Sequence, residues 1–256
     1  INPKEKIVKK LVVALAAVVL ASAMLFGAGA YAQTAAKNRL LPVYNVERTD
    51  NKCAISFDAA WGADKTRQIM DVCDRYNVKA TFFLVGFWVD KYPEMVREIH
   101  ERGFEIGTHS NTHPQMSKLS QSDVAAQLSV SSKKIYDITG TEVKLFRPPF
   151  GDYNNTLVST AAEQGLLTIQ WSVDSLDWKG LSAKEIATRV QKAQSGDIIL
   201  CHNNSDHIVE ALPLVFEALA LKGLSVVPVG ELVYYDNYTI NAAGKQIPNA
   251  STNDKG

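Results

Sequence analysis

Short apolar segments alternate with helix-like segments along most of this chain, and this alternation constrains the fold more than any other feature of the sequence. Seven segments have the length and composition of strands: Cys53–Asp58, Ala80–Val85, Phe104–Thr108, Lys144–Arg147, Leu167–Val173, Asp197–His202 and Leu224–Val229. The helical patterns between them span about 12 to 18 residues, begin at polar residues and end at glycines. The starts are Asp64, Ser122, Asn154 and Ser182, and the stops are Gly103, Gly140, Gly165, Gly196 and Gly223. This pattern predicts an α/β fold whose parallel sheet is closed, or nearly closed, into a (β/α) barrel of about seven strands.

The composition bounds the size of the core and the kind of partner. With 256 residues, of which 46% are hydrophobic, the chain can bury a large core in one domain or two. We expect the folded domain over residues 51–238, between a polar linker at 33–50 and a polar tail at 239–256. The net charge is zero and no basic face is evident, so the sequence predicts no nucleic-acid partner.

The N-terminal segment has the pattern of a membrane-directed sequence. Residues 1–10 carry four lysines against one glutamate and form a basic, cytoplasmic end, while residues 11–32 begin with twenty uncharged, mostly apolar positions. About 20 such residues cross a hydrocarbon core as a helix. Because Ala30-Tyr31-Ala32 is also a cleavable pattern, a transmembrane anchor, a signal peptide and a buried core helix all stay open. Either membrane-directed alternative places the rest of the chain outside the cytoplasm, on the cell membrane or secreted.

Three cysteines, each in an apolar run, do not make a disulfide framework. Cys53, Cys73 and Cys201 are therefore predicted to be buried free thiols. Cys201 precedes His202, but neighbouring strand residues point to opposite faces of a sheet, which argues against a Cys–His nucleophile.

Unusual polar residues stand at the ends of the predicted strands. They are Asp58, His109, Arg147, Asp174, Asp177 and His202. In a βα-barrel the carboxyl ends of the strands converge on one face, where active sites are built. We therefore expect these side chains to share one site.

His109 and His113 are four residues apart, a spacing that can place two imidazoles on one metal ion. Pro114 and the polar residues between the two histidines favour a loop. The alternative is a pair of surface or capping histidines.

Two pairs of charged residues can carry acid–base chemistry. Asp58 lies inside an apolar strand and needs a partner, which Arg147 can provide; the pair is either a general base held ionised or a structural ion pair. Asp177 can fix the tautomer of His202 and raise its pKa, so that His202 delivers a proton to a leaving amine. A satisfied core histidine is the alternative for His202.

The segment Arg147-Pro148-Pro149-Phe150-Gly151 lacks two backbone donors and has two restricted φ angles. Such a rigid turn can aim the Phe150 N–H into the site as an oxyanion donor, or it can simply hold a loop. Trp61, Trp171 and Trp178 offer apolar faces to a sugar ring, or they belong to the core.

Five segments, taken in order, resemble the polysaccharide deacetylase family, also described as the NodB homology domain or carbohydrate esterase family four. They are SFDAAWG at 56–62, THSNTH at 108–113, RPPFG at 147–151, DSLDW at 174–178 and LCH at 200–202. The resemblance covers about residues 50–233 and implies a distorted (β/α) barrel. It also implies hydrolysis of acetyl groups on a glycan polymer with a divalent metal, usually zinc. FDAAWG, RPPFGDYNN, DSLDWKG and CHNN look most similar to the spore-associated, membrane-anchored branch.

The resemblance implies a role for each matching residue. The assignments are Asp58 as base, Arg147 as its tuner, His109 and His113 as metal ligands, Phe150 as the oxyanion amide, His202 as acid, Asp177 as its tuner, and Trp178 and Leu200 as the walls of the acetyl pocket.

Ala59 is the departure from the family pattern, since it stands where most members have the metal-binding aspartate. A methyl group cannot bind zinc, and two histidines alone leave a four-coordinate sphere incomplete. Asp64 is the nearest substitute, although it is equally suited to cap a helix before Lys65. We predict that a divalent metal is bound weakly or is absent.

Three readings of the function stay open. The first is a hydrolase that removes acetyl groups from N-acetylated cell-wall or spore glycans, favoured by the retained base, acid and tuners. The second is a non-catalytic glycan-binding or sporulation scaffold protein, favoured by Ala59. The third is a barrel that hydrolyses a small cyclic amide, which a membrane-tethered protein facing outward suits less well.

Overall fold

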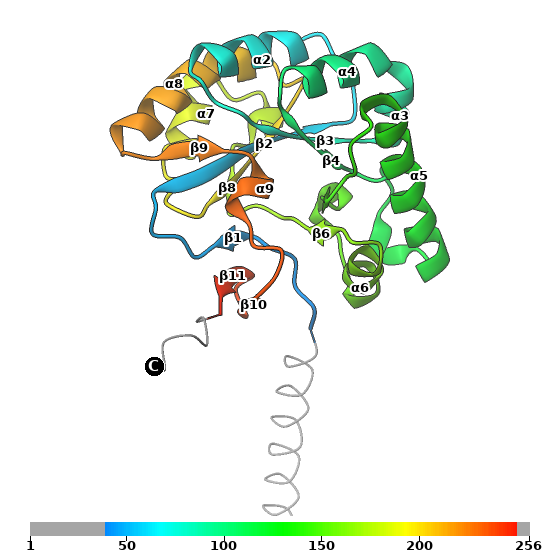
Figure 1. The fold of residues 1–256 in the computed structure, drawn as a ribbon. Coiled ribbons are helices and arrows are strands. Elements are labelled where there is room, and N and C mark those ends of the chain that lie inside the picture. The colour runs from blue at the N-terminus through cyan, green and yellow to red at the C-terminus, as the bar shows by residue number, and fades with distance from the viewer. Residues whose placement is uncertain (1–38, 250–256) are drawn as a thin grey trace, which may run out of the picture. The chain divides into compact units, whose positions relative to one another are not determined.

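The centre of the molecule is a curled parallel sheet, seen in a computed structural model that describes residues 39–249 (Figure 1). Seven strands follow one another in the order β6-β5-β4-β3-β2-β8-β7, and β9 pairs with the start of β2. The strands are β2 (Lys52–Ala59), β3 (Thr81–Leu84), β4 (Glu105–Thr108), β5 (Leu145–Phe146), β6 (Leu167–Thr168), β7 (Val173–Asp174), β8 (Ile198–His202) and β9 (Ser225–Val227). The predicted α/β barrel of about seven strands is confirmed.

Helices cover the outside of the curled sheet in Figure 1. They are α2 (Thr66–Arg75), α3 (Gly86–Lys91), α4 (Pro93–Glu101), α5 (Gln121–Thr139), α6 (Asn155–Glu163), α7 (Ala183–Val190), α8 (Ile208–Leu221) and α9 (Val229–Leu232), with short 3₁₀ turns η1 (Met116–Lys118), η2 (Pro149–Gly151) and η3 (Asp177–Lys179). The predicted caps Asn154 and Ser182 are confirmed, because their side chains accept hydrogen bonds from Leu157 and Glu185 N–H groups.

Two predicted helix starts are displaced. The cap of α5 is Ser120 and not Ser122, since the Ser120 hydroxyl accepts from the Asp123 N–H at 3.2 Å. Asp64 does not cap α2: Lys65 occupies the cap position and makes no side-chain cap bond. The sequence could not settle either start, because several polar residues precede each helix.

The residues of β2 alternate between two environments, which is how the sheet positions its functional groups. Cys53, Ile55 and Phe57 pack into a large apolar cluster with α2, α4 and α8. Ser56 and Asp58, on the other face, point into the barrel, where Arg147 lies. Burial of the apolar face thus fixes which residues reach the interior.

The predicted strand Leu167–Val173 is wrong as a single element. It is divided into β6 and β7, which lie at the two edges of the sheet. The segment before β2 contacts the sheet at two places: Val43 is bridged to Ile169, which follows β6, and Asn45 to Asp197, which precedes β8. Residues that the sequence placed in a linker are therefore part of the folded domain.

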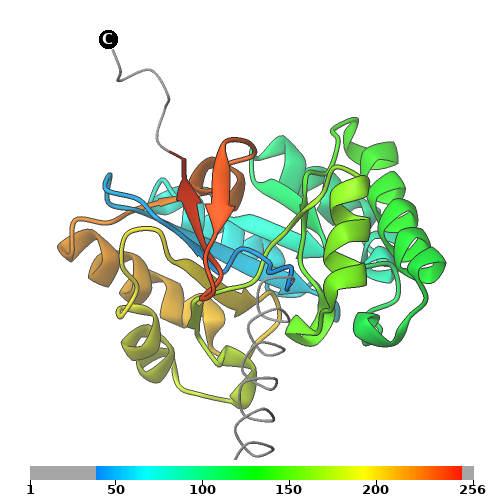
Figure 2. The same ribbon diagram turned by 90° about the horizontal axis from the view of Figure 1, so that it is seen from below.

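Both predicted boundaries of the folded part are too narrow. Val43 and Val46 are buried, and β1 (Asn45–Val46) pairs with β11 (Lys245–Pro248), so the predicted linker is folded from about residue 40. β10 (Tyr238–Ile240) and β11 form an antiparallel hairpin beside β1, so the predicted polar tail is structured as far as Pro248 (Figure 2). The buried Gln246 side chain holds this hairpin in place, because it accepts a hydrogen bond from the Tyr234 N–H and donates one to the Tyr234 C=O. A buried residue of this polar type made the segment look like a solvated tail in the sequence.

The predicted membrane segment at 11–32 and the basic end before it lie outside the described residues. Within residues 39–249, no helix combines the length and apolar character needed to cross a membrane. Cys53, Cys73 and Cys201 are buried free thiols, as the sequence predicts.

Candidate active site

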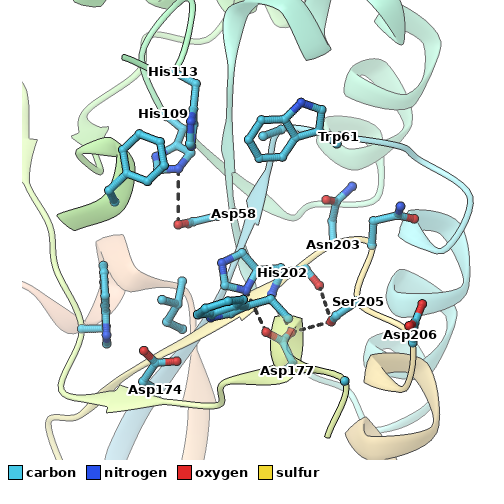
Figure 3. Close-up of a pocket in the computed structure, with 17 residues that line it drawn as sticks. Asp58, Trp61, His109, His113, Asp174, Asp177, His202, Asn203, Ser205 and Asp206 are labelled. Atoms are coloured by element: carbon cyan, nitrogen blue, oxygen red, sulfur yellow. Dashed lines mark hydrogen bonds and ion pairs between the residues drawn. The ribbon is translucent and has the colours of Figure 1, made fainter. Parts of the chain in front are cut away.

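The polar residues predicted at strand ends meet in one cleft of about 740 Å³ (Figure 3). Its lining includes Asp58, His109, His113, Asp174, Asp177 and His202. In Figure 3, Asp58 lies between the two imidazoles of His109 and His113 and the third imidazole of His202. Arg147 lies behind this lining and is completely buried.

Asp58 is held by two cationic or potentially cationic groups. Its Oδ1 accepts a hydrogen bond from Arg147 Nη1 at 2.9 Å, and its Oδ2 lies 3.4 Å from His109 Nε2. Burial opposes ionisation of Asp58, but neighbouring positive charge, of which Arg147 is the permanent source, outweighs it, so the pKa of Asp58 is below its ordinary value. Asp58 is therefore a carboxylate at neutral pH and can accept a proton.

Arg147 is held by several contacts, although its Nε–H is buried without a hydrogen-bond partner among the described residues. Its Nη1 also donates to Ser56 Oγ at 2.8 Å, and its Nη2 donates to the Gln170 carbonyl at 3.1 Å. The guanidinium lies 4.2 Å from the centre of the Phe83 ring. Its charge is therefore aimed at Asp58 with little freedom to move away.

The two predicted metal-binding histidines lie side by side, with ring centres 5.0 Å apart. His109 Nδ1 is 2.7 Å from the Arg147 carbonyl, and because a carbonyl can only accept, Nδ1 carries the proton and Nε2 faces Asp58. Burial lowers the pKa of His109, and burial together with the neighbouring His109 lowers the pKa of His113 to about 4. Both imidazoles are neutral at pH 7, the form that can bind a metal.

The remaining groups do not complete a metal site. Ala59 is fully buried within the apolar cluster of β2, α2 and α4 and does not line the cleft. Asp64 is exposed ahead of α2 and does not line the cleft either. Throughout residues 39–249, no group of three or more His, Cys, Asp or Glu side chains is placed to hold a metal ion. The donors present do not fit a zinc site with three protein ligands.

His202 and Asp177 form the opposite side of the cleft. Asp177 Oδ1 is 2.7 Å from His202 Nδ1, and Asp177 Oδ2 accepts from the His202 N–H at 2.8 Å and from Ser205 Oγ at 2.7 Å. Burial opposes protonation of His202, but the hydrogen bond and charge of Asp177 outweigh it and raise the pKa of His202. A protonated His202 therefore presents an Nε2–H to the cleft.

The turn at Pro148–Gly151 has the rigid geometry that its two prolines predict. Phe150 has a φ of 61° in the left-handed region, which an L-residue adopts at a cost and usually only where the surroundings require it. Its side chain is 65% exposed, and its N–H has no hydrogen-bond partner among the described residues. That N–H is free to bind an oxyanion. Trp178 and Leu200, predicted to line the acetyl pocket, do line this cleft.

Comparisons with known proteins agree with this geometry. The family model of the polysaccharide deacetylases matches residues 45–169. A peptidoglycan-N-acetylglucosamine deacetylase of Bacillus cereus is 34% identical over 198 residues, which cover 75% of this chain and 92% of that protein. The chain belongs to the polysaccharide deacetylase family.

One solved structure from this family is a pseudoenzyme. A CE4 family pseudoenzyme from Bacillus anthracis is similar to this chain with a TM-score of 0.73 and 32% identity, over 76% of this chain and 71% of that one. A mutant of that pseudoenzyme with restored enzymatic activity is equally similar, at a TM-score of 0.73 and 33% identity. The family therefore contains members that lack activity while keeping the fold.

Several curated relatives are longer than this chain. An uncharacterized Bacillus subtilis protein, YlxY, is 33% identical over 193 residues, and the chain spans only 60% of its length. The chain likewise spans 39% of a Listeria monocytogenes peptidoglycan-N-acetylglucosamine deacetylase.

Three supporting residues of this polysaccharide deacetylase site were not found from the sequence. Ser56 and Gln170 orient Arg147, and Ser205 orients Asp177. A hydroxyl two positions before Asp58 on the same strand face could have indicated Ser56. Gln170 acts through its carbonyl, which every residue has, so no sequence signal identifies it.

Proposed function

We propose that this chain is a hydrolase that removes acetyl groups from N-acetylated cell-wall or spore glycans. The observation that carries the proposal is that two proton-transfer pairs face one cleft: Asp58 with Arg147, and His202 with Asp177. One pair lowers the pKa of a carboxyl group and so favours its ionised form, and the other raises the pKa of an imidazole and so favours its protonated form. A protein that only binds glycan needs neither.

The residues support a two-step hydrolysis. Asp58 takes a proton from a water molecule as its oxygen attacks the acetyl carbonyl carbon, and the Phe150 N–H stabilises the oxyanion that forms. The C–N bond then breaks as His202 gives its proton to the leaving nitrogen, so the products are acetate and a free amine. Each proton-transfer group contributes roughly 10²- to 10⁴-fold to such a rate.

We infer that a divalent metal, zinc by the usual choice of the family, is bound weakly or not at all. Support comes from Ala59, which removes a carboxylate ligand and packs among apolar residues. The rate is accordingly expected to be low.

The second candidate is a non-catalytic glycan-binding or sporulation scaffold protein that retains the cleft. Ala59 and the similarity to a pseudoenzyme of the same family favour it. This candidate differs from the first in one measurable respect, since it releases no acetate at any metal concentration.

The deciding experiment measures acetate release from N-acetylglucosamine oligomers and from peptidoglycan by the full chain, with and without added zinc or cobalt. We expect slow release by the wild type and a loss of about 10²-fold or more in Asp58→Asn. An unchanged rate in Asp58→Asn contradicts the catalytic proposal. Absence of release by the wild type, followed by release in Ala59→Asp, supports the scaffold.

We also propose that residues 11–32 hold the domain on the outer face of the cell membrane, or direct its secretion if they are cleaved. Two arguments support this: the sequence pattern of residues 11–32, and the fact that a protein outside the membrane could reach a polymeric cell-wall substrate. Fractionation of cells followed by N-terminal sequencing of the mature protein tests it.

A further inference from the structure

The base and the acid of the proposed reaction lie on neighbouring strands. β2 and β8 are parallel, and their register places Asp58 beside His202, the last residue of β8. Both residues line the cleft, and each has its own partner, Arg147 for Asp58 and Asp177 for His202 (Figure 3). The separation of the two groups therefore depends on how the chain is fixed where each strand ends.

Asn203, which directly follows His202, joins these two strand ends. It is only 2% exposed. Its backbone N–H donates to the Asp58 carbonyl at 3.1 Å. Its side-chain Nδ2 donates to the Gly62 carbonyl at 2.9 Å and to Thr66 Oγ1 at 3.1 Å. One buried side chain thus ties the loop after β8 to the loop after β2. Proton-transfer chemistry uses none of these bonds directly.

The Gly62 carbonyl is the point where the two loops meet. Gly62 has a φ of 68°, and a Cβ at this position would lie 2.5 Å from Asn204 Nδ2, so only glycine allows the residues after His202 to approach this closely. The same carbonyl accepts a second hydrogen bond, from Trp88 Nε1 of α3 at 2.7 Å. That bond holds the loop after β2 from a different element and does not involve β8.

We propose that Asn203 fixes the separation of Asp58 and His202 by clamping together the loops that follow them, and is thereby a positioning residue for the hydrolysis. The inference rests on the proposed function for the reaction that the clamp serves. The base and the acid act in turn on the same acetyl group, so both must stay within reach of it. A misplacement of about 1 Å can cost roughly 10²-fold in rate.

The test compares two variants of the full chain that each remove one donor from the Gly62 carbonyl. Asn203→Ala removes the link to β8, whereas Trp88→Phe removes the bond from α3 and leaves that link in place. Acetate release from N-acetylglucosamine oligomers is measured. We expect kcat to fall about tenfold or more in Asn203→Ala with KM little changed, because the clamp sets geometry and does not hold substrate. Trp88→Phe, the matched control, should keep the wild-type kcat.

A second measurement does not depend on catalysis. Burial opposes protonation of His202, while Asp177 and, to a smaller degree, Asp58 raise its pKa. NMR titration of the His202 imidazole in EDTA, with and without Asp58→Asn, measures how strongly Asp58 acts on His202. In the Asn203→Ala background this effect should fall to about half or less, since the interaction of two charges weakens with distance and with entering water. In the Trp88→Phe background it should be unchanged.

An effect of Asp58 on His202 that is undiminished in Asn203→Ala overturns the inference, as does an equal loss in Trp88→Phe, which would indicate general loosening of the loop. A higher KM with unchanged kcat in Asn203→Ala also overturns it. Thr66→Val removes one acceptor of Asn203 Nδ2 and should give the same changes in weaker form, so it decides the question if Asn203→Ala does not fold. If the wild type releases no acetate but the effect of Asp58 on His202 still depends on Asn203, the proposed hydrolase is refuted and the clamp stands.

Discussion

The two sides of the cleft differ in how completely their polar groups are paired. On the acid side, Asp177 accepts three hydrogen bonds, two from His202 and one from Ser205. On the opposite side, His109 is oriented by the Arg147 carbonyl, but no other residue among 39–249 is hydrogen-bonded to the ring nitrogens of His113, and a methyl group stands at position 59. The proton-transfer groups are thus retained in full, and only the metal-binding part is incomplete.

A deacetylase site combines proton-transfer groups with metal ligands, and only the proton-transfer groups also contribute to the stability of the fold. The pairing of Asp58 with Arg147 and of His202 with Asp177 also stabilises the fold, because each pair removes an unpaired charge from a buried position. A metal ligand has no such second role when the metal is absent. Loss of the ligand at position 59 is therefore compatible with a well-formed cleft.

Removing Arg147 should produce the largest effect. Arg147→Met leaves Asp58 buried without its counter-charge, and we expect the free energy of unfolding to fall by about 3–5 kcal/mol. Urea denaturation measures the loss. The double variant Arg147→Met/Asp58→Leu removes both charges and should be more stable than the single variant; equal stability would show that the ion pair is not the cause.

The next largest effect is expected from a variant that restores the missing carboxylate at position 59. Ala59→Asp places a charge among apolar residues, so without metal we expect a loss of about 2 to 3 kcal/mol in the free energy of unfolding. Zinc should then raise the melting temperature of this variant much more than that of the wild type, because a ligand that binds only the folded state stabilises it. Ala59→Asn, with the same shape and no charge, is the control. One equivalent of tightly held zinc in the purified wild type would contradict the incomplete site.

The pair of His202 and Asp177 should make the free energy of unfolding depend on pH. The folded-state pKa of His202 is raised above the ordinary value of 6.5, so the pair stabilises the fold fully below pH 6.5 and this contribution is lost as the pH rises through the folded pKa. In Asp177→Asn, the deficit relative to the wild type should accordingly be larger at pH 5.5 than at pH 8.5. A deficit that is constant with pH would exclude a charged His202, and NMR titration of its imidazole checks the pKa directly.

Ser205→Ala should have the smallest effect. It removes one of three hydrogen bonds to Asp177, and we expect a loss of about 1.5 kcal/mol in unfolding free energy. Because Asp177 then attracts the imidazolium more strongly, the pKa of His202 should rise in the same NMR titration. Ser205→Thr keeps the hydroxyl and should resemble the wild type in both measurements; a lower His202 pKa in Ser205→Ala would show that Ser205 does not act through Asp177.

Much of the fold and the site followed from local patterns. Seven strand-like segments, with glycine stops after the helices, were enough to predict the barrel, and polar residues at strand ends were enough to predict that Asp58, Asp177 and His202 share one cleft. These inferences hold because parallel strands bring their carboxyl ends together whatever the loops do. The boundaries failed where the evidence was not local: β1 is paired with β11 across about 200 residues, and Val43 is bridged to Ile169, between β6 and β7 in the chain.

The sequence by itself determined the chemistry that is present: a carboxylate with an arginine, an imidazole with an aspartate, two further histidines, and alanine in place of a metal ligand. Only the tertiary structure decided how these groups act on one another. It directed His109 Nε2 towards Asp58, buried Ala59 in the apolar layer, and placed His113 between Trp61 and Phe150. The physical reason is that residue types and their spacing along the chain are local, whereas a hydrogen bond, a desolvated charge or a supported aromatic face depends on atoms brought together from distant strands and loops.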